Sequence, residues 1–191
     1  MAEPGKKLGL IGRPLSHSFS KKYFDKKFAR LGITEYSYHQ FELQNIQALP
    51  DLLENTPGLV GLNVTIPYKQ EVLTYIDELS MEASTIGAVN VIKIAEGKLL
   101  GFNSDYFGFK ASLINWLPEN WQGKALVLGT GGASLAVHAV LDDCGIPWVK
   151  VSRDTGEDRL SYQQVKDRNL LKDHHLVINT TPLGMYPNIE N

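Results

Sequence analysis

A glycine-rich segment in the second half of the sequence has the spacing of a phosphate-binding loop. The segment Gly129-Thr130-Gly131-Gly132-Ala133-Ser134 follows a short apolar run and opens a helical pattern. Gly129 permits a tight turn. Gly131 has no side chain to keep the backbone from a pyrophosphate, whose charge the N–H groups at a helix start attract. Ser134 stands where a third glycine is usual. The segment predicts dinucleotide binding, with an ordinary strand–helix turn as the alternative.

Arg153 indicates which dinucleotide this loop would bind. It follows the next apolar run, about where dinucleotide-binding folds bind a 2′-phosphate. Arginine suits that task because its guanidinium presents fixed donors to phosphate oxygens. Asp154 beside it would instead hold the ribose of an unphosphorylated cofactor. We therefore expect NADP, with NAD as the alternative, and a solvated surface charge is the simpler interpretation of Arg153.

The first half carries polar side chains at places where a structural role does not require them. They stand near the ends of predicted strands or the starts of predicted helices: Ser16, Ser18, Asn63, Thr65, Lys69, Asn90, Asn103 and Asp105. Lys69 is expected at a helix start, where a cation opposes the helix dipole and costs stability unless a ligand compensates. The simpler alternatives are a surface lysine for Lys69, helix caps for Ser16, Ser18 and Asp105, and a strand-edge amide for Asn90.

The elements expected to position these side chains alternate between short apolar strands and amphipathic helices. The first half predicts strands at 8–11, 36–41 and 59–65, helices at 18–31, 46–53 and 69–79, and a hairpin of 89–94 with 98–102. The second half predicts strands at 125–128, 148–152 and 175–180 and helices at 133–143 and 162–172. We expect Ser18 or Ser20 to cap the first helix, Gly32 to end it, and Glu96-Gly97 to form the hairpin turn.

This order predicts an α/β protein whose second half is a parallel, doubly wound sheet. We expect an N-terminal α/β domain at 1–104, a connecting segment at 105–121 and a Rossmann-like domain at 122–191. Three parallel strands alone would leave an apolar edge uncovered after Thr181. We therefore expect the second domain to be incomplete at its C-terminal end, or to expose apolar surface there.

Composition excludes several classes of function. The 191 residues are 43% hydrophobic and 21% charged with a net charge of −2, so no basic field favours nucleic acid. No apolar run approaches the roughly 20 residues of a membrane span, and the first residues lack the apolar run of a secretory signal. The single cysteine, Cys144, excludes an internal disulfide and fits a cytoplasmic location. We expect a small-molecule substrate, no metal, and a monomer or homodimer.

Together these segments resemble the shikimate dehydrogenase family over nearly the whole chain. Five segments are similar to the family's motifs and occur in its order: Gly12–Ser18, Asn63–Lys69, Gly87–Asn90, Asn103–Asp105 and Asn179–Met185. Five motifs in one order are far more specific than any single one.

The resemblance implies reversible oxidation of shikimate to 3-dehydroshikimate with NADP, a step of aromatic amino-acid biosynthesis. The N-terminal domain would then bind substrate, and the Rossmann-like domain NADP. Ser16 and Ser18 would hold the substrate carboxylate, and ring hydroxyls would contact Asn63, Thr65, Asn90 and Asn103. Lys69 and Asp105 would manage the proton, with the acceptor between them left open. The cofactor would contact Gly129, Gly131, Gly132, Ala133, Ser134, Ser152, Arg153, Asn179, Thr181 and Met185.

Three departures from the family pattern keep alternatives open. Ser104 replaces a threonine, and Phe102 replaces the more usual aspartate. Ser152-Arg153-Asp154 replaces the Asn-Arg-Thr common in NADP-dependent members. The family also continues past this length with a helix whose glutamine touches substrate. The alternatives are a sister enzyme that accepts quinate and prefers NAD, and a noncatalytic shikimate-sensing module with the same fold.

Overall fold

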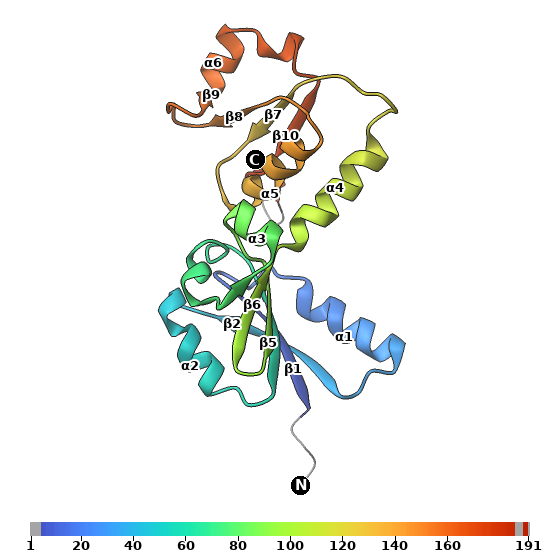
Figure 1. Cartoon of the computed structure of the whole chain (residues 1–191), viewed down its shortest axis with the longest axis vertical. Coiled ribbons are helices and arrows are strands. Elements are labelled where there is room, and N and C mark those ends of the chain that lie inside the picture. The colour runs from blue at the N-terminus through green and yellow to red at the C-terminus, as the bar shows by residue number, and fades with distance from the viewer. Residues whose placement is uncertain (1–4, 186–188, 191) are drawn as a thin grey trace. The chain divides into compact units, whose positions relative to one another are not determined.

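The computed structural model describes residues 5–185 and 189–190 of the chain (Figure 1). Contacts between Cα atoms divide the chain into two compact units, Met1–Asn103 and Ser104–Asn191. Each unit has its own sheet and its own core. Within the described residues, no helix has the length and apolar character that crossing a membrane requires.

A six-stranded mixed sheet forms the centre of the first unit. Its strands lie in the order β2 (Tyr36–Glu42), β1 (Lys6–Gly12), β3 (Leu59–Val64), β5 (Val91–Ala95), β6 (Lys98–Phe102) and β4 (Glu78–Leu79). β1 pairs in parallel with both β2 and β3, whereas β5 runs antiparallel to β3 and β6 antiparallel to β5. β3 and β6 therefore end at the same edge of the sheet, and β5 begins there.

Helices cover both faces of this sheet because neighbouring β1 residues point to opposite sides. Leu10 packs with Tyr38 and with Phe24 and Phe28 of helix α1 (Ser20–Leu31). Ile11 packs into the larger core, which takes in Leu49 of α2 (Leu49–Glu54). The remaining helical segments are η1 (Ile46–Ala48), η2 (Glu71–Tyr75) and α3 (Met81–Ile86).

The helix expected over residues 69–79 is wrong. Only a short 3-10 segment, η2, forms there, and Glu78–Leu79 joins the sheet as strand β4. The Asp77 N–H donates to the Leu99 carbonyl at 3.0 Å, and the Asp77 carboxylate accepts from the Leu99 N–H at 2.7 Å. Backbone groups that a helix would pair internally are thus bonded to the sheet edge, so tertiary pairing overrides the local periodicity.

The expected side-chain cap of the first helix is also wrong. Phe19 occupies the N-cap position of α1, and no side chain caps it. The Ser18 hydroxyl instead accepts from the Ser20 N–H at 3.3 Å. The expected end at Gly32 and the turn at Glu96-Gly97 are present, and all three residues have positive φ. Helix α3, which sequence analysis left out, is capped by Ser80.

The second unit is a four-stranded parallel sheet in the order β10 (Leu176–Asn179), β7 (Ala125–Leu128), β8 (Trp148–Ser152) and β9 (Leu160–Ser161). Helices α4 (Ser104–Trp116) and α5 (Gly132–Asp143) pack together on the face of the sheet to which Ala125 and Val127 point. Leu126 faces the other side, with Val165 of α6 (Tyr162–Asp167). The doubly wound α/β arrangement is therefore present, with helices on both faces.

Two details of this unit differ from expectation. β9 adds a short fourth strand, and the helix expected over 162–172 is divided into α6 and η3 (Leu170–Lys172) at Asn169, which has a φ of 53°. By its contacts, α4 belongs to the second unit.

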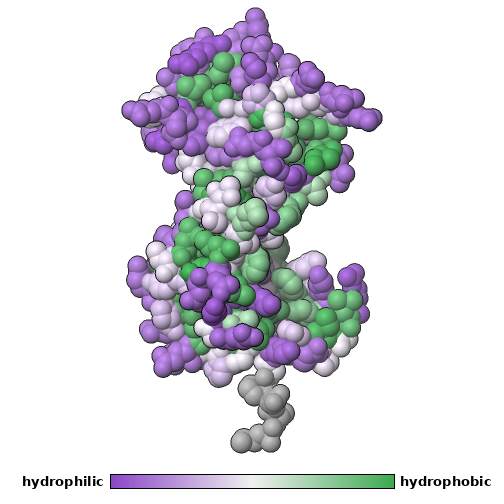
Figure 2. Space-filling model, viewed as in Figure 1, coloured by the Kyte–Doolittle hydropathy of each residue, from purple (hydrophilic) through white to green (hydrophobic). Residues whose placement is uncertain are grey.

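Strand β10 forms an edge of this sheet within the described residues. It pairs with β7, and Val177 on it is 50% exposed. Leu183 and Met185, which follow β10, are also more than half exposed. This is the exposed apolar surface expected after Thr181. Elsewhere in Figure 2 apolar residues show at the surface among a mainly hydrophilic cover.

Candidate active site

The predicted substrate-binding residues of the first unit come together at one edge of its sheet. Asn63 near the end of β3 is in register with Val91 of β5, which is in register with Phe102 of β6. Asn90 immediately precedes Val91, and Asn103 immediately follows Phe102. Three amide side chains from segments that are distant in the sequence therefore lie at neighbouring strand ends.

Backbone hydrogen bonds lock the loops at this edge to one another. The Thr65 N–H donates to the Ile11 carbonyl at 2.9 Å, which ties the end of β3 to the end of β1. The Val89 N–H donates to the Lys69 carbonyl at 2.7 Å, which ties the lysine turn to the segment before β5. Because these segments share backbone bonds, the spacing of their side chains is a property of the sheet and not of flexible loops.

Asn90 and Asn103 are buried polar residues. Asn103 is 1% exposed, and its Nδ2 donates to the Ala88 carbonyl at 2.9 Å. The Asn90 N–H donates to the Phe102 carbonyl at 3.0 Å. An amide buried at a strand end is expensive unless it is hydrogen-bonded. Through its bond to Ala88, Asn103 thus holds in place the segment that carries Asn90, in addition to its predicted role toward substrate.

Lys69 lies in a turn after β3 and is partly buried. The expectation that it begins an α-helix is wrong, since residues 66–70 form turns before the 3-10 segment. The argument from the helix dipole therefore does not apply. What remains is a lysine at the same strand-end edge as Asn63, Thr65 and Asn90.

Ser16 and Ser18 lie in the loop between β1 and α1, and buried Leu15 anchors this loop. The Leu15 N–H donates to Glu42 Oε2 at 2.8 Å, and Arg13 donates to the Gln44 carbonyl at 2.9 Å. Glu42 is a site-supporting residue that sequence reasoning missed. Its position at the last residue of a strand gave no signal, because its partner is a backbone group 27 residues away.

Tyr38 is a second residue that sequence reasoning missed. It lies on β2, is 2% exposed, and donates from Oη to Asn63 Oδ1 at 2.7 Å. Burial raises the pKa of Tyr38 to about 12, and a hydrogen bond from Ser20 partly offsets this. The phenol is therefore protonated near neutral pH. The available signal was only that a buried tyrosine needs a partner for its hydroxyl.

Asp105 lies in the second unit, in the first turn of α4. Tyr106 Oη donates to Asp143 Oδ2 of α5 at 2.7 Å, and Lys110 forms an ion pair with the same carboxylate. These bonds join the helix that carries Asp105 to the helix that follows the glycine-rich loop. Lys69 and Asp105 thus belong to different units.

The glycine-rich loop joins β7 to α5 as predicted. Gly129 has a φ of 109°, and a Cβ there would lie 2.7 Å from Thr180 Oγ1. Ser134 is buried, and its hydroxyl donates to the Gly131 carbonyl at 2.7 Å. By contrast, a Cβ on Gly131 would meet no atom within 4 Å. The loop is therefore packed on its inner side and open at Gly131.

The open side of this loop fits a dinucleotide. The first N–H groups of an α-helix have no acceptor within the helix, and α5 has no acidic residue in its first turn. A negatively charged pyrophosphate would meet donors there and no carboxylate of that turn. Gly131 would allow it to approach the backbone.

The Asn179–Met185 segment turns beside the loop. Thr180 donates from its hydroxyl to the Leu128 carbonyl at 2.6 Å, which holds the end of β10 against the end of β7. Asn179 Oδ1 accepts from both the N–H and the hydroxyl of Thr181. Met185 is more than half exposed. Thr180 is a structural support that sequence analysis did not single out.

Ser152, Arg153 and Asp154 stand at the end of β8, the strand next to β7. Arg153 and Asp154 are both exposed. Their place at the carboxyl end of the second strand is where such folds recognise the ribose and any 2′-phosphate.

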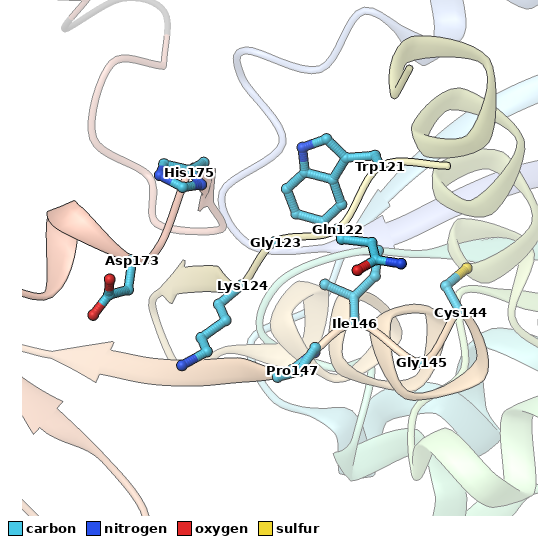
Figure 3. Close-up of a pocket in the computed structure, with 10 residues that line it drawn as sticks. All are labelled: Trp121, Gln122, Gly123, Lys124, Cys144, Gly145, Ile146, Pro147, Asp173 and His175. Atoms are coloured by element: carbon cyan, nitrogen blue, oxygen red, sulfur yellow. The ribbon is translucent and has the colours of Figure 1, made fainter. Parts of the chain in front are cut away.

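A depression of about 580 Å³ lies at the other end of this sheet (Figure 3). It is formed by Trp121–Lys124 before β7, Cys144–Pro147 before β8, and Asp173 and His175 before β10. Ligands of parallel α/β sheets bind at the carboxyl ends of the strands, whereas these segments precede the strands. None of the predicted site residues lines it. No group of three His, Cys, Asp or Glu side chains in the described part of the chain is placed to hold a metal.

Comparison with known proteins identifies relatives over almost the entire chain. The family model for the shikimate dehydrogenase substrate binding domain matches residues 10–92. The shikimate dehydrogenase (NADP(+)) of Clostridium beijerinckii is 41% identical over 192 aligned positions, which cover 96% of this chain and 70% of the relative.

Solved structures agree. Shikimate dehydrogenase 1 from Peptoclostridium difficile superposes with a TM-score of 0.79 at 37% identity, covering 96% of this chain and 69% of that one. A Thermus thermophilus shikimate 5-dehydrogenase, solved with NADP(H) and shikimate, superposes with a TM-score of 0.78 at 32% identity, covering 94% and 70%. The strand-end cluster, the glycine-rich loop and these likenesses agree, and the chain belongs to the shikimate dehydrogenase family.

Proposed function

We propose that this protein is an NADP-dependent shikimate dehydrogenase, an oxidoreductase of aromatic amino-acid biosynthesis that interconverts shikimate and 3-dehydroshikimate. The observation that carries the proposal is the cluster at the edge of the first sheet, where Asn63, Thr65, Lys69, Asn90 and Asn103 lie at adjoining strand ends. Its relatives in both comparisons bear this activity in their names. A small polyhydroxylated ring is the kind of ligand that such a cluster of amide and hydroxyl groups would orient.

The proposed division of labour assigns one task to each of three segments of the chain. Residues 1–104 would bind the substrate, 105–121 would connect, and 122–191 would bind NADP. Ser16 and Ser18 would donate to the substrate carboxylate, while Asn63, Thr65, Asn90 and Asn103 would contact ring hydroxyls. In the nucleotide domain the cofactor would contact Gly129, Gly131, Gly132, Ala133, Ser134, Ser152, Arg153, Asn179, Thr181 and Met185.

The chemistry to be managed is the loss of a hydride from a ring carbon and of a proton from its hydroxyl. NADP, when bound, supplies the hydride acceptor. The protein must orient the ring and take the proton, which we assign to Lys69 and Asp105 acting as a pair. In the reverse direction the same pair returns the proton to the carbonyl oxygen as the hydride is added to carbon.

The direct test is a spectrophotometric assay of nicotinamide reduction with shikimate and with quinate, each with NADP and with NAD. The proposal expects turnover with shikimate and NADP well above the other three combinations. A preference for quinate with NAD would support the sister enzyme instead. Substrate binding without turnover in any combination would support a shikimate-sensing module. We also propose a cytoplasmic location and a monomer or homodimer, the latter to be measured by light scattering.

A further inference from the structure

Tyr38 lies outside every motif used above, yet it touches the candidate substrate site. Its Oη donates to Asn63 Oδ1 at 2.7 Å, and its ring stacks on Phe24 with centroids 4.3 Å apart and planes 11° apart. Tyr38, Phe24 and Asn63 all lie in the first unit. A buried aromatic ring fixed by stacking has little freedom to withdraw its hydroxyl from this position.

The hydrogen bond decides which end of the Asn63 amide is available to a ligand. An asparagine side chain carries an acceptor oxygen and a donor NH2, and it exchanges them by a half-turn. Tyr38 binds the oxygen, so the NH2 group is the end directed away from Tyr38. Any ligand atom that Asn63 binds through its NH2 must therefore be an acceptor.

The contact itself sets the direction of this bond. A phenol oxygen can accept as well as donate, whereas an amide oxygen only accepts. Because the atom that lies 2.7 Å from Tyr38 Oη is the Asn63 oxygen, the Tyr38 proton is directed to Asn63.

We propose that Tyr38 is a positioning residue that holds the Asn63 amide with its NH2 toward the ligand, and so selects a ring bearing a hydrogen-bond acceptor at that point. The inference rests on the proposed function, because it assumes that Asn63 contacts the substrate. It adds a specificity determinant on β2, a strand without any of the five motifs.

The test compares Tyr38→Phe with a matched control, Tyr68→Phe. Tyr68 is also 2% exposed, and its Oη donates to the Leu43 carbonyl at 2.7 Å, a contact with no predicted site residue. Each variant removes one buried hydroxyl and one short hydrogen bond. Both should therefore lose similar stability in a thermal melt, and only Tyr38→Phe should change ligand selection.

Calorimetric titration would measure the dissociation constants of shikimate and of ring-deoxy analogues that each lack one hydroxyl. We expect Tyr38→Phe to bind shikimate about tenfold more weakly. We also expect it to lose discrimination against the one analogue whose missing hydroxyl faces Asn63. Tyr68→Phe should keep the wild-type ratio for every analogue. In the enzyme assay the change should be in KM, with kcat little altered.

A double-mutant cycle shows whether Tyr38 acts through Asn63. If it does, Tyr38→Phe should have no further effect on shikimate binding in an Asn63→Ala background. Wild-type ratios in Tyr38→Phe, or additive losses in the cycle, would overturn the inference while leaving the proposed function intact. Wild-type protein that binds no shikimate would overturn the proposed function, and the assignment to Tyr38 with it.

Discussion

The two units prepare their candidate sites in opposite ways. In the first unit the site consists of side chains, two of which, Asn90 and Asn103, are buried. Specific hydrogen bonds hold some of them, such as Tyr38 to Asn63 and Asn103 to Ala88. In the second unit the site consists of the backbone of a loop that is open at Gly131, together with exposed residues after β8. The first arrangement suits recognition of a small ring with several polar groups. The second suits a large anionic cofactor that recurs in many enzymes.

This difference implies different sensitivity to substitution. A buried polar side chain shares its partners with neighbours, so its loss leaves other groups unpaired. The loss of an exposed side chain that contacts the cofactor leaves few other groups unpaired. We therefore expect larger and more strongly coupled effects at the edge of the first sheet than after β8.

The largest expected effect comes from Lys69 and Asp105, the residues proposed to transfer the proton. Positioned proton transfer contributes about 10²–10⁴-fold to rate, so Lys69→Ala should lower kcat by about that factor with much less change in KM. Asp105→Asn should also lower kcat, and the two losses should not add if the residues act as one. Steady-state kinetics of both single variants and the double variant measure this. A Lys69→Ala enzyme that keeps most of its kcat would show that the pair is not catalytic.

The second prediction concerns acid stability, which should differ between the units. His138 of α5 is buried and stacks on Trp148, with ring centroids 4.0 Å apart. Burial, and secondly the charge of Lys150, lowers the pKa of His138 from 6.5 to about 4, while Asp142 and Asp158 oppose the shift. Because the folded pKa is below the unfolded one, the unfolded chain takes up the proton first. His138 therefore costs no stability above pH 6.5, and the free energy of unfolding decreases as the pH falls from 6.5 toward 4.

The free energy of unfolding of the second unit should fall by up to about 3 kcal/mol from this group over that range. All three tryptophans, Trp116, Trp121 and Trp148, lie in the second unit, so their fluorescence in urea titrations reports on it alone. His138→Phe keeps a ring against Trp148 and should flatten the dependence. An equal pH dependence in wild type and His138→Phe would assign the acid sensitivity to the carboxylates.

The third prediction separates a structural glycine from a ligand-facing one. Gly129→Ala should cost at least about 2 kcal/mol, because it combines a positive φ with a close approach to Thr180. Gly131→Ala should change stability by less than about 1 kcal/mol, since its φ of −80° is ordinary and its surroundings are open. It should nevertheless raise the KM for NADP. Thermal melts and cofactor titrations of both variants measure the contrast, which would fail if Gly131→Ala bound NADP normally.

The smallest expected effect is at Arg153. Arg153→Ala should weaken NADP by about tenfold, the loss of a charge-assisted contact at an exposed site, and should change NAD binding little. The ratio of kcat/KM for the two cofactors is the measurement, and Arg153→Lys is the matched control because it keeps the charge and loses the planar fork. If the wild-type protein uses NAD as well as NADP, Asp154 becomes the more important residue.

Several parts of the fold could be predicted from local sequence alone. The glycine-rich loop, the end of α1 at Gly32 and the turn at Glu96-Gly97 all depend on backbone conformations that glycine adopts easily. The strands β1, β3, β7 and β8 follow from short apolar runs bounded by turn residues. The structure of residues 69–79, by contrast, depends on a distant part of the chain and does not follow from local sequence. Their apolar spacing favours a helix, but the backbone at residues 77–79 bonds to β6, which lies 22 residues further along the chain.

The sequence by itself determined which residues are candidates for the chemistry, because the order of five motifs and the types of their side chains require no coordinates. Only the tertiary structure decided which side chains form hydrogen bonds with one another and with distant backbone groups. The bond from Tyr38 to Asn63 spans 25 residues, and the bond from Asn103 to Ala88 spans 15. Both arise from strand pairing, in which β1 separates β2 from β3 and β6 runs antiparallel beside β5. Register between distant strands depends on the packing of the whole sheet, and for that reason no local pattern identified Tyr38.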